Sequence, residues 1–394
     1  MAIGKAPQAF PRSEYLRRLA LVKSEMTRRN IDALVINSWA NITYLTGNFT
    51  RMLAMHALVV STREEEPTLI VRRMCAPGAF HQSFLSHDKV ISYSESYVGK
   101  HDRDGFDAVI DFIHDLGVAS RGIGLELGNL TAQAAEKFKA RLPNATIVEC
   151  TKAVDWIRGV KSDLEIEVMR QAAALADAAV MRAAEVIRPG VREADAAAEI
   201  MTAQVRGAEG VPPATGLRPL LMKSSPRVCT PHILWSEDVF REGSQIDMEV
   251  SGNRHQYMAA LMRSFSIGAP SDRLLRLHEA HAAGIEAALN VIRPGRTCSD
   301  VAEVVYRAIE KHGFKKESRC GYAIGIESQT SAWIEPTASF GIGDMTELKP
   351  NMTFHLMMGN WVEEEFGYEI SETICVTDSG VEVLTRAPRQ LFQL

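Results

Sequence analysis

The chain has 394 residues, of which 46% are hydrophobic and 24% are charged, and its formal net charge is −5. This length predicts two domains, and the composition is that of an ordinary globular protein. The mildly acidic balance excludes a nucleic-acid partner of the kind that needs a basic footprint. No apolar run approaches the roughly 20 residues that span a membrane, and the N-terminus lacks the apolar core of a secretory signal. The six scattered cysteines form no CxxC pair, which favours free thiols and a cytoplasmic location.

The first 156 residues alternate between helix and strand patterns. Residues 13–30 carry an apolar stripe at helical spacing, and IDALVIN at 31–37 is typical of a buried strand. Further strands are expected at 41–48, 56–61, 67–71, 89–93, 122–126 and 146–150, and further helices at 104–116 and 131–140. This order predicts an α/β domain over residues 1–156.

An internal repeat organises the rest of the chain. EVIRPGVREADAAAEI (185–200) and NVIRPGRTCSDVAEVV (290–305) align without a gap, 105 residues apart. Each predicts a helix end, a Pro-Gly turn, an Asp cap (Asp195 and Asp300) and a new helix. Upstream, Ser162 and Glu165 have capping-box spacing at the start of a long Ala-rich helix. Two such halves predict a pseudo-twofold domain over residues 157–394, with helices packed on a curved, mostly antiparallel sheet, so that the whole chain is α+β.

Residues 245–268 predict a β-hairpin, because the apolar-rich runs IDMEV and YMAALMRSF flank the polar segment SGNRHQ. The spacing resembles the metal-binding hairpin of the aminopeptidase P, prolidase and methionine aminopeptidase family, in which two Asp eleven residues apart hold a pair of divalent metals. Anchoring on Tyr257 and Arg263, which we interpret as a structural residue, puts Glu249 at the first Asp position and Ala260 at the second.

The resemblance implies the pita-bread fold for residues 157–394 and a creatinase-like domain for residues 1–156. The segments around the other three metal-ligand positions, where the family has His, Glu and Glu, can also be aligned with this chain. In this chain these positions are occupied by Tyr322, Met357 and Ser371. Divalent metals of this kind need several oxygen or imidazole ligands. Since only Glu249 keeps a carboxylate, we expect no metal and no other cofactor.

Metal-free chemistry is known in this fold. Creatinase hydrolyses a C–N bond with a His on the cleft wall, and the segment TPHILW places His232 at the matching position. This segment and KESRCGYAIG, NMTFHLMMG and YEISETICVT are also similar to ectoine hydrolase, another metal-free member, which opens a cyclic amidine. The resemblance implies that His232 shuttles a proton and that Glu249 acts as nucleophile or as the base that activates water.

Other candidates follow from their places in the same segments. Glu335 and Glu372 either bind a cationic substrate or form structural ion pairs, and both readings stay open. Tyr322 is expected to point into the vacated metal space, and His355 is either a substrate-binding or a core histidine. In creatinase-like homodimers the loop at 48–56 reaches the partner's site, which would bring Arg51 and His56 to the substrate. An Arg in place of the aromatic residues of ectoine hydrolases indicates a carboxylate-bearing ligand.

These observations predict a metal-independent hydrolase that acts on a non-peptide C–N bond of a small molecule, either a cyclic amidine or a guanidino acid. A homodimer without nucleic-acid or membrane partners is expected. Two alternatives remain open. One is a metal-dependent Xaa-Pro aminopeptidase or prolidase, and the other is a non-catalytic pita-bread binding module.

Overall fold

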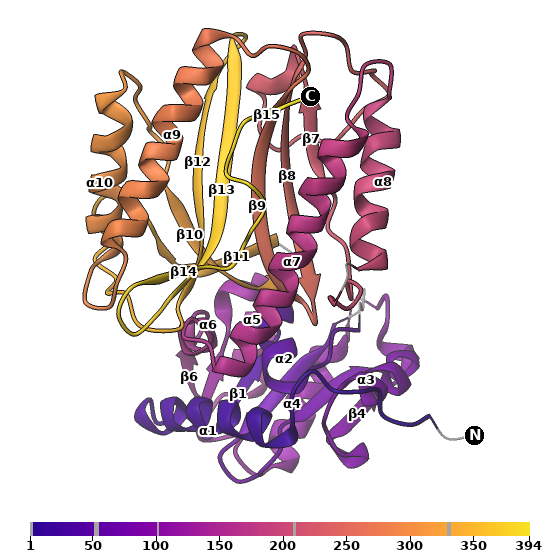
Figure 1. The fold of residues 1–394 in the computed structure, drawn as a ribbon. Coiled ribbons are helices and arrows are strands. Elements are labelled where there is room, and N and C mark those ends of the chain that lie inside the picture. The colour runs from indigo at the N-terminus through magenta and orange to yellow at the C-terminus, as the bar shows by residue number, and fades with distance from the viewer. Residues whose placement is uncertain (1–2, 51–54, 101, 208–209, 329–331) are drawn as a thin grey trace. The chain divides into compact units, whose positions relative to one another are not determined.

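The computed structural model describes residues 3–50, 55–100, 102–207, 210–328 and 332–394, and Figure 1 shows their fold. The chain divides into two compact units, Met1–Arg158 and Gly159–Leu394, two residues from the boundary expected at 156/157. No helix in the described part is long and apolar enough to cross a membrane. The two units together give the α+β organisation that the sequence predicts.

The first unit is a six-stranded sheet with helices packed against it, in the order β4-β3-β2-β1-β5-β6. Its strands are β1 (Ala33–Ile36), β2 (Ala57–Ser61), β3 (Thr68–Arg72), β4 (Val90–Tyr93), β5 (Gly122–Leu125) and β6 (Thr146–Glu149). Its helices are α1 (Arg12–Arg28), α2 (Trp39–Thr46), α3 (Ala76–Gln82), α4 (Gly105–Asp115), α5 (Ala132–Arg141) and α6 (Ala153–Arg158). Side chains of α4 and α5, such as Ile110 and Phe138, form one core with Val35 and Ile123 of the sheet.

The strand predicted at 41–48 is wrong, because these residues form most of helix α2. The Ser38 hydroxyl caps this helix by accepting from the Asn41 N–H, and Gly47 ends it in the left-handed conformation. The buried Glu126 carboxylate accepts the N–H groups of Asn37 and Ser38 just before the first turn. The β-branched residues of NITYLT suggest a strand, but the caps at both ends favour a helix.

The second unit is built on a nine-stranded sheet, counted over the described residues, with the order β14-β13-β12-β10-β9-β8-β7. β11 pairs with β10, and the terminal β15 pairs with β9. The strands are β7 (Leu221–Ser224), β8 (Gln245–Arg254), β9 (Tyr257–Ser266), β10 (Gly321–Ser328), β11 (Ala332–Ser339), β12 (Thr353–Val362), β13 (Phe366–Val376), β14 (Val381–Val383) and β15 (Phe392–Gln393). All neighbours are antiparallel except β15 and β9. The predicted hairpin at 245–268 is therefore confirmed as β8 and β9.

Two helix pairs cover this sheet, as the internal repeat predicts: α7 (Asp163–Val186) with α8 (Glu193–Arg206), and α9 (Asp272–Val291) with α10 (Cys298–Lys311) (Figure 1). The Pro-Gly turn of each pair has its glycine at positive φ, 85° at Gly190 and 83° at Gly295. The capping box of Ser162 and Glu165 at the start of α7 is confirmed.

The predicted Asp caps of α8 and α10 are wrong by three residues. Arg192 and Thr297 hold the N-cap positions, and Asp195 and Asp300 lie in the first turns. Asp300 completes a capping box with Thr297, while Asp195 pairs with the Arg192 guanidinium. In both helices the acidic group still lies near the positive end of the helix dipole, which is why the sequence pattern looks like a cap.

The two faces of the sheet differ in character because side chains alternate along each strand. One face, the helical face, carries apolar residues that pack under the four helices. They include Met248, Val250, Leu261 and Phe265 next to α7 and α8, and Phe354, Leu356, Ile370 and Ile374 next to α9 and α10. The residues between them point to the opposite side. This polar face is defined by Asp247, Glu249, His355 and Ser371, which are all buried.

Candidate active site

The two hairpin positions that resemble metal-ligand sites lie close together on the polar face. Glu249 of β8 stands opposite Met262 of β9, and Ser251 stands opposite Ala260. Glu249 and Ala260 are therefore diagonal neighbours on one face.

The other three positions reach the same face from β10, β12 and β13. Met357 stands directly opposite Ser371, and Tyr322 stands opposite His355. The backbone N–H of Met262 donates to the Ser371 hydroxyl at 2.7 Å and so joins the hairpin to β13. The five positions thus form one group in space.

The side chains at these positions do not fit a pair of divalent metals. Ala260 offers a methyl group and Met357 a thioether, and neither is an oxygen or imidazole ligand. The hydroxyl groups of Tyr322 and Ser371 are already bonded to His355. In the described part of the chain, no group of three or more His, Cys, Asp or Glu side chains is arranged to hold a metal ion. A carboxylate remains only at Glu249.

A series of hydrogen bonds connects two of these positions, Tyr322 and Ser371, through His355. The His355 Nδ1 lies 2.9 Å from the Tyr322 hydroxyl, and its Nε2 lies 2.7 Å from the Ser371 hydroxyl. Trp333 Nε1 donates to the Tyr322 hydroxyl from β11 at 3.1 Å. Burial, helped by the charge of Arg319, lowers the pKa of His355 to about 3, so the imidazole is neutral. Burial also raises the pKa of the Tyr322 hydroxyl, which therefore keeps its proton.

Glu249 is a buried carboxyl group that favours its protonated form. It is 5% exposed, and in the part of the chain that the structure describes its carboxyl group makes no hydrogen bond. Burial and the charge of Glu369 raise the pKa of Glu249, the charge of Lys223 acts in the opposite direction, and the net result is a pKa of about 8. A carboxyl group with this pKa can exchange a proton near neutrality, which suits acid–base work.

Three charged residues of this face were not among the candidates from the sequence: Lys223, Asp247 and Glu369. Lys223 Nζ lies 2.9 Å from Glu369 Oε2, and both side chains are 1% exposed. Asp247 accepts from the Ser264 hydroxyl at 2.7 Å. Alternation could have indicated Asp247 and Glu369, since each lies two residues from a ligand position on its own strand. Nothing local indicates Lys223, which lies in the short run LMKS.

Glu335 and Lys161 form the ion pair that the sequence left open. The Lys161 ammonium lies 2.6 Å from Glu335 Oε2, and both side chains are 1% exposed. Glu335 is two residues from Trp333 on β11, whose indole reaches Tyr322.

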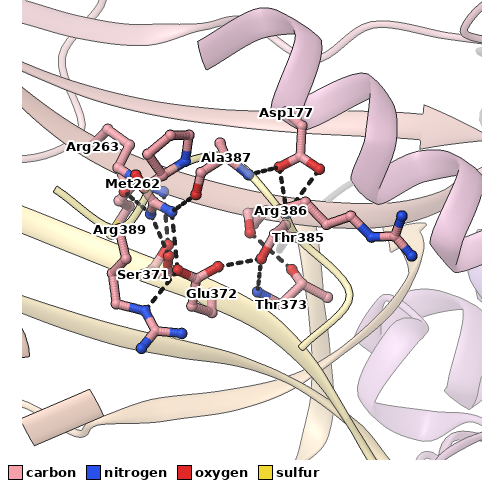
Figure 2. Close-up of polar contacts among 12 residues, drawn as sticks. Asp177, Met262, Arg263, Ser371, Glu372, Thr373, Thr385, Arg386, Ala387 and Arg389 are labelled. Carbon is pink, nitrogen blue, oxygen red and sulfur yellow. Dashed lines mark hydrogen bonds and ion pairs between the residues drawn. The ribbon is translucent and has the colours of Figure 1, made fainter. Parts of the chain in front are cut away.

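Glu372 does not lie with the other candidates, because alternation along β13 turns it to the helical face while Ser371 takes the polar face. Its Oε1 lies 2.9 Å from an Arg263 nitrogen and 3.0 Å from Arg389 Nε, and its Oε2 accepts from the Thr385 hydroxyl. Figure 2 shows these contacts. Of the two interpretations of Glu372, these contacts favour the structural ion pair over a role in substrate binding.

The same network ties the C-terminal segment to the sheet, which supports the structural interpretation of Arg263. This fully buried side chain donates to the backbone oxygens of Ser371, Ala387 and Pro388. Asp177 of α7 accepts the N–H groups of Arg386 and Ala387 (Figure 2).

Replacing Arg263 by leucine is expected to lower the free energy of unfolding by about 3–5 kcal/mol. The buried carbonyl groups lose their hydrogen-bond donor, and the Glu372 carboxylate loses its buried ion-pair partner. Arg389→Leu is the matched control. It removes a partner of the same carboxylate, but its side chain is 24% exposed and Arg263 remains, so a loss of at most about 1 kcal/mol is expected. Chemical denaturation measures both, and equal losses would contradict the central role of Arg263.

His232 lies in the segment that follows β7, with an exposed side chain and φ of 62°. Two residues later, Leu234 bridges to Leu221, which itself stands opposite Glu249. The segment therefore runs along the edge of the sheet level with Glu249. No hydrogen bond joins His232 to Glu249 within the described residues.

The two candidates of the loop at 48–56 belong to the first unit. Arg51 lies outside the described residues. His56 precedes β2, and its ring packs edge-on against Trp39 with 5.3 Å between the ring centres.

Comparisons with known proteins agree with this architecture. The model of metallopeptidase family M24 matches residues 167–378, and that of the creatinase/prolidase N-terminal domain matches residues 18–160. The chain is 58% identical to the uncharacterized hydrolase/peptidase y4tL of Sinorhizobium fredii over 393 residues, 99% of each chain. It is 36% identical to the ectoine hydrolase of Halomonas elongata, over 97% of this chain and 98% of the relative. The X-Pro aminopeptidase of Thermotoga maritima has the same fold, with a TM-score of 0.82 at 22% identity, over 96% of this chain and 99% of that one. The chain therefore belongs to metallopeptidase family M24, a family of hydrolases and peptidases, and carries the creatinase/prolidase N-terminal domain of its relatives.

Proposed function

We propose that this protein is a metal-independent hydrolase of a non-peptide C–N bond in a small cyclic amidine or guanidino acid. One observation carries the proposal. Of the five clustered positions that resemble metal-ligand sites, four hold Ala260, Tyr322, Met357 and Ser371, and only Glu249 keeps a carboxylate. The similarity to an ectoine hydrolase over nearly the whole chain supports the same class of reaction.

The protonated state of Glu249 fits a cationic substrate. A positively charged amidinium or guanidinium group next to a carboxyl group lowers its pKa, so substrate binding would drive the proton off Glu249. The resulting carboxylate either takes a proton from a water molecule that attacks the central carbon, or attacks that carbon itself to form a covalent intermediate that water hydrolyses after the C–N bond has broken. The C–N bond then breaks, and His232 gives the departing nitrogen a proton. Tyr322 and Ser371 offer hydroxyl groups to the polar atoms of the bound molecule.

Metal content tests the metal-free part of this proposal. After incubation with manganese, cobalt or zinc and removal of free ions, the protein is expected to hold far less than one ion per chain, because its ligand positions lack the donors. Elemental analysis makes the measurement, and turnover should be unchanged by a chelator. Two ions per chain would favour the Xaa-Pro aminopeptidase alternative.

A substrate screen tests the reaction class. Ectoine, creatine and dipeptides ending in proline distinguish the proposed hydrolase from a peptidase and from a non-catalytic module. The proposed hydrolase acts on ectoine or on creatine and leaves the dipeptides intact. Hydrolysis of the proline dipeptides alone would support a peptidase. Binding without turnover of any compound would support a non-catalytic module.

We also propose a cytoplasmic homodimer in which Arg51 and His56 reach the partner's site. A monomer in sedimentation equilibrium would contradict this arrangement.

A further inference from the structure

A buried row of charged side chains lies beside the vacated ligand positions. Lys223 of β7 stands directly opposite Asp247 of β8, and Asp247 stands opposite Ser264 of β9. The Ser264 hydroxyl continues the row by donating to Asp247 and contacting the backbone of Glu369 on β13. Lys223 reaches across the row to Glu369, 2.9 Å away. Four strands therefore contribute to one charged group.

This row lies one step along the sheet from Glu249. Asp247 and Glu249 are two residues apart on β8, so their side chains share the polar face at a spacing of roughly 7 Å. Glu369 is likewise two residues from Ser371 on β13. The row is thus parallel to the ligand positions and adjacent to them.

The charges of the row do not balance without Lys223. Asp247 and Glu369 are at most 1% exposed, and an uncompensated carboxylate in such surroundings is strongly unfavourable. Burial lowers the pKa of Lys223, but the charges of Glu369 and Asp247 outweigh burial and raise it overall, so the side chain is an ammonium ion. Asp247 Oδ2 and Glu369 Oε1 have no hydrogen-bond partner among the described residues, which leaves oxygen atoms able to contact a cation.

We propose that Lys223 is a built-in cation, a side-chain ammonium that supplies the fixed positive charge that metal-dependent relatives obtain from divalent ions. The inference rests on the proposed metal-free function. It also has a direct consequence for this chain. Once Lys223 is removed, the carboxyl groups of the row take up a cation from solution.

The test compares thermal unfolding of the wild type and Lys223→Ala at pH 7.5, each in sodium chloride, methylammonium chloride and sodium chloride with manganese chloride. Lys223→Ala alone is expected to unfold about 10 °C below the wild type, because one partner of a buried ion pair is lost. Methylammonium or manganese is expected to restore about 5 °C in the variant and to leave the wild type unchanged. If the variant is insoluble, its refolding yield with and without each cation gives the same comparison.

Lys161→Ala is the matched control, since Lys161 is equally buried and paired with Glu335. A cation response in Lys223→Ala, absent from Lys161→Ala and from the wild type, supports the proposal. The absence of any response in Lys223→Ala, or an equal response in all three proteins, overturns it. The assay needs no substrate, so its failure is distinguishable from failure of the proposed hydrolysis.

Discussion

Replacing His232 by alanine is expected to lower kcat by about 10²- to 10⁴-fold, the usual contribution of a positioned general acid or base. The fold should survive, because the side chain is exposed and makes no hydrogen bond among the described residues. The measurement is kcat on the compound that the substrate screen identifies, together with the thermal midpoint.

The backbone at His232 requires a second variant. Its φ of 62° lies in the left-handed region, where alanine costs about 1 kcal/mol and asparagine is better tolerated. His232→Asn therefore removes the imidazole with less backbone strain. Both variants should lose the same activity. Unchanged turnover in either of them would contradict the proton-shuttle role.

Replacing Glu249 by glutamine is expected to abolish turnover and to stabilise the protein at neutral and alkaline pH. Glutamine keeps the shape of the side chain but can neither ionise nor attack a carbon atom. It also removes the need to bury a charge. The activity loss should exceed about 10³-fold, because the group that forms or activates the nucleophile is missing. Full activity in Glu249→Gln would exclude Glu249 from the mechanism.

The sign of the stability change follows from the pKa of Glu249, which is raised from 4.5 to about 8 on folding. The folded state then binds more protons than the unfolded state between these pH values. The contribution of Glu249 to the free energy of unfolding is therefore at its maximum below pH 4.5. It falls by about 1.4 kcal/mol per pH unit as the pH rises from 4.5 to about 8. Glu249→Gln should equal the wild type in stability near pH 4.5, exceed it increasingly as the pH rises, and reach its full advantage near pH 8. Urea unfolding at several pH values measures the difference, and parallel curves would contradict the raised pKa.

Local pattern and spacing explain why parts of this fold could be predicted. The hairpin of β8 and β9 has strong alternation and a polar turn, and the repeat at 185–200 and 290–305 places the same turn before both helix pairs. Ser162 and Glu165 form their capping box at three-residue spacing. In each case the decisive residues are neighbours in sequence, so the interaction that fixes the structure is visible there.

Other features depend on partners that are distant in sequence. Helix α2 is held by Glu126, more than 80 residues away, and no local pattern reveals that contact. Alternation could have placed Glu372 on the face opposite Ser371, but its partner Arg263 lies 109 residues away in the sequence. Lys223 becomes a site residue only when β7 and β13 come together, 146 residues apart. The candidate site could therefore be located from the sequence, but its charge balance could not.

The series of hydrogen bonds that runs from Trp333 through Tyr322, His355 and Ser371 to Met262 contains one hydrogen atom more than it needs. Four hydrogen bonds join the groups of this series. Five hydrogen atoms are available to form them, one each from the Trp333 indole, the Met262 backbone, the Tyr322 and Ser371 hydroxyls and the neutral His355 imidazole. One hydroxyl hydrogen is left over. It belongs to Ser371 when His355 carries its proton on Nε2, and to Tyr322 when the proton is on Nδ1. A change of tautomer at a histidine that stays neutral near pH 7 thus moves a free donor from one end of the site to the other.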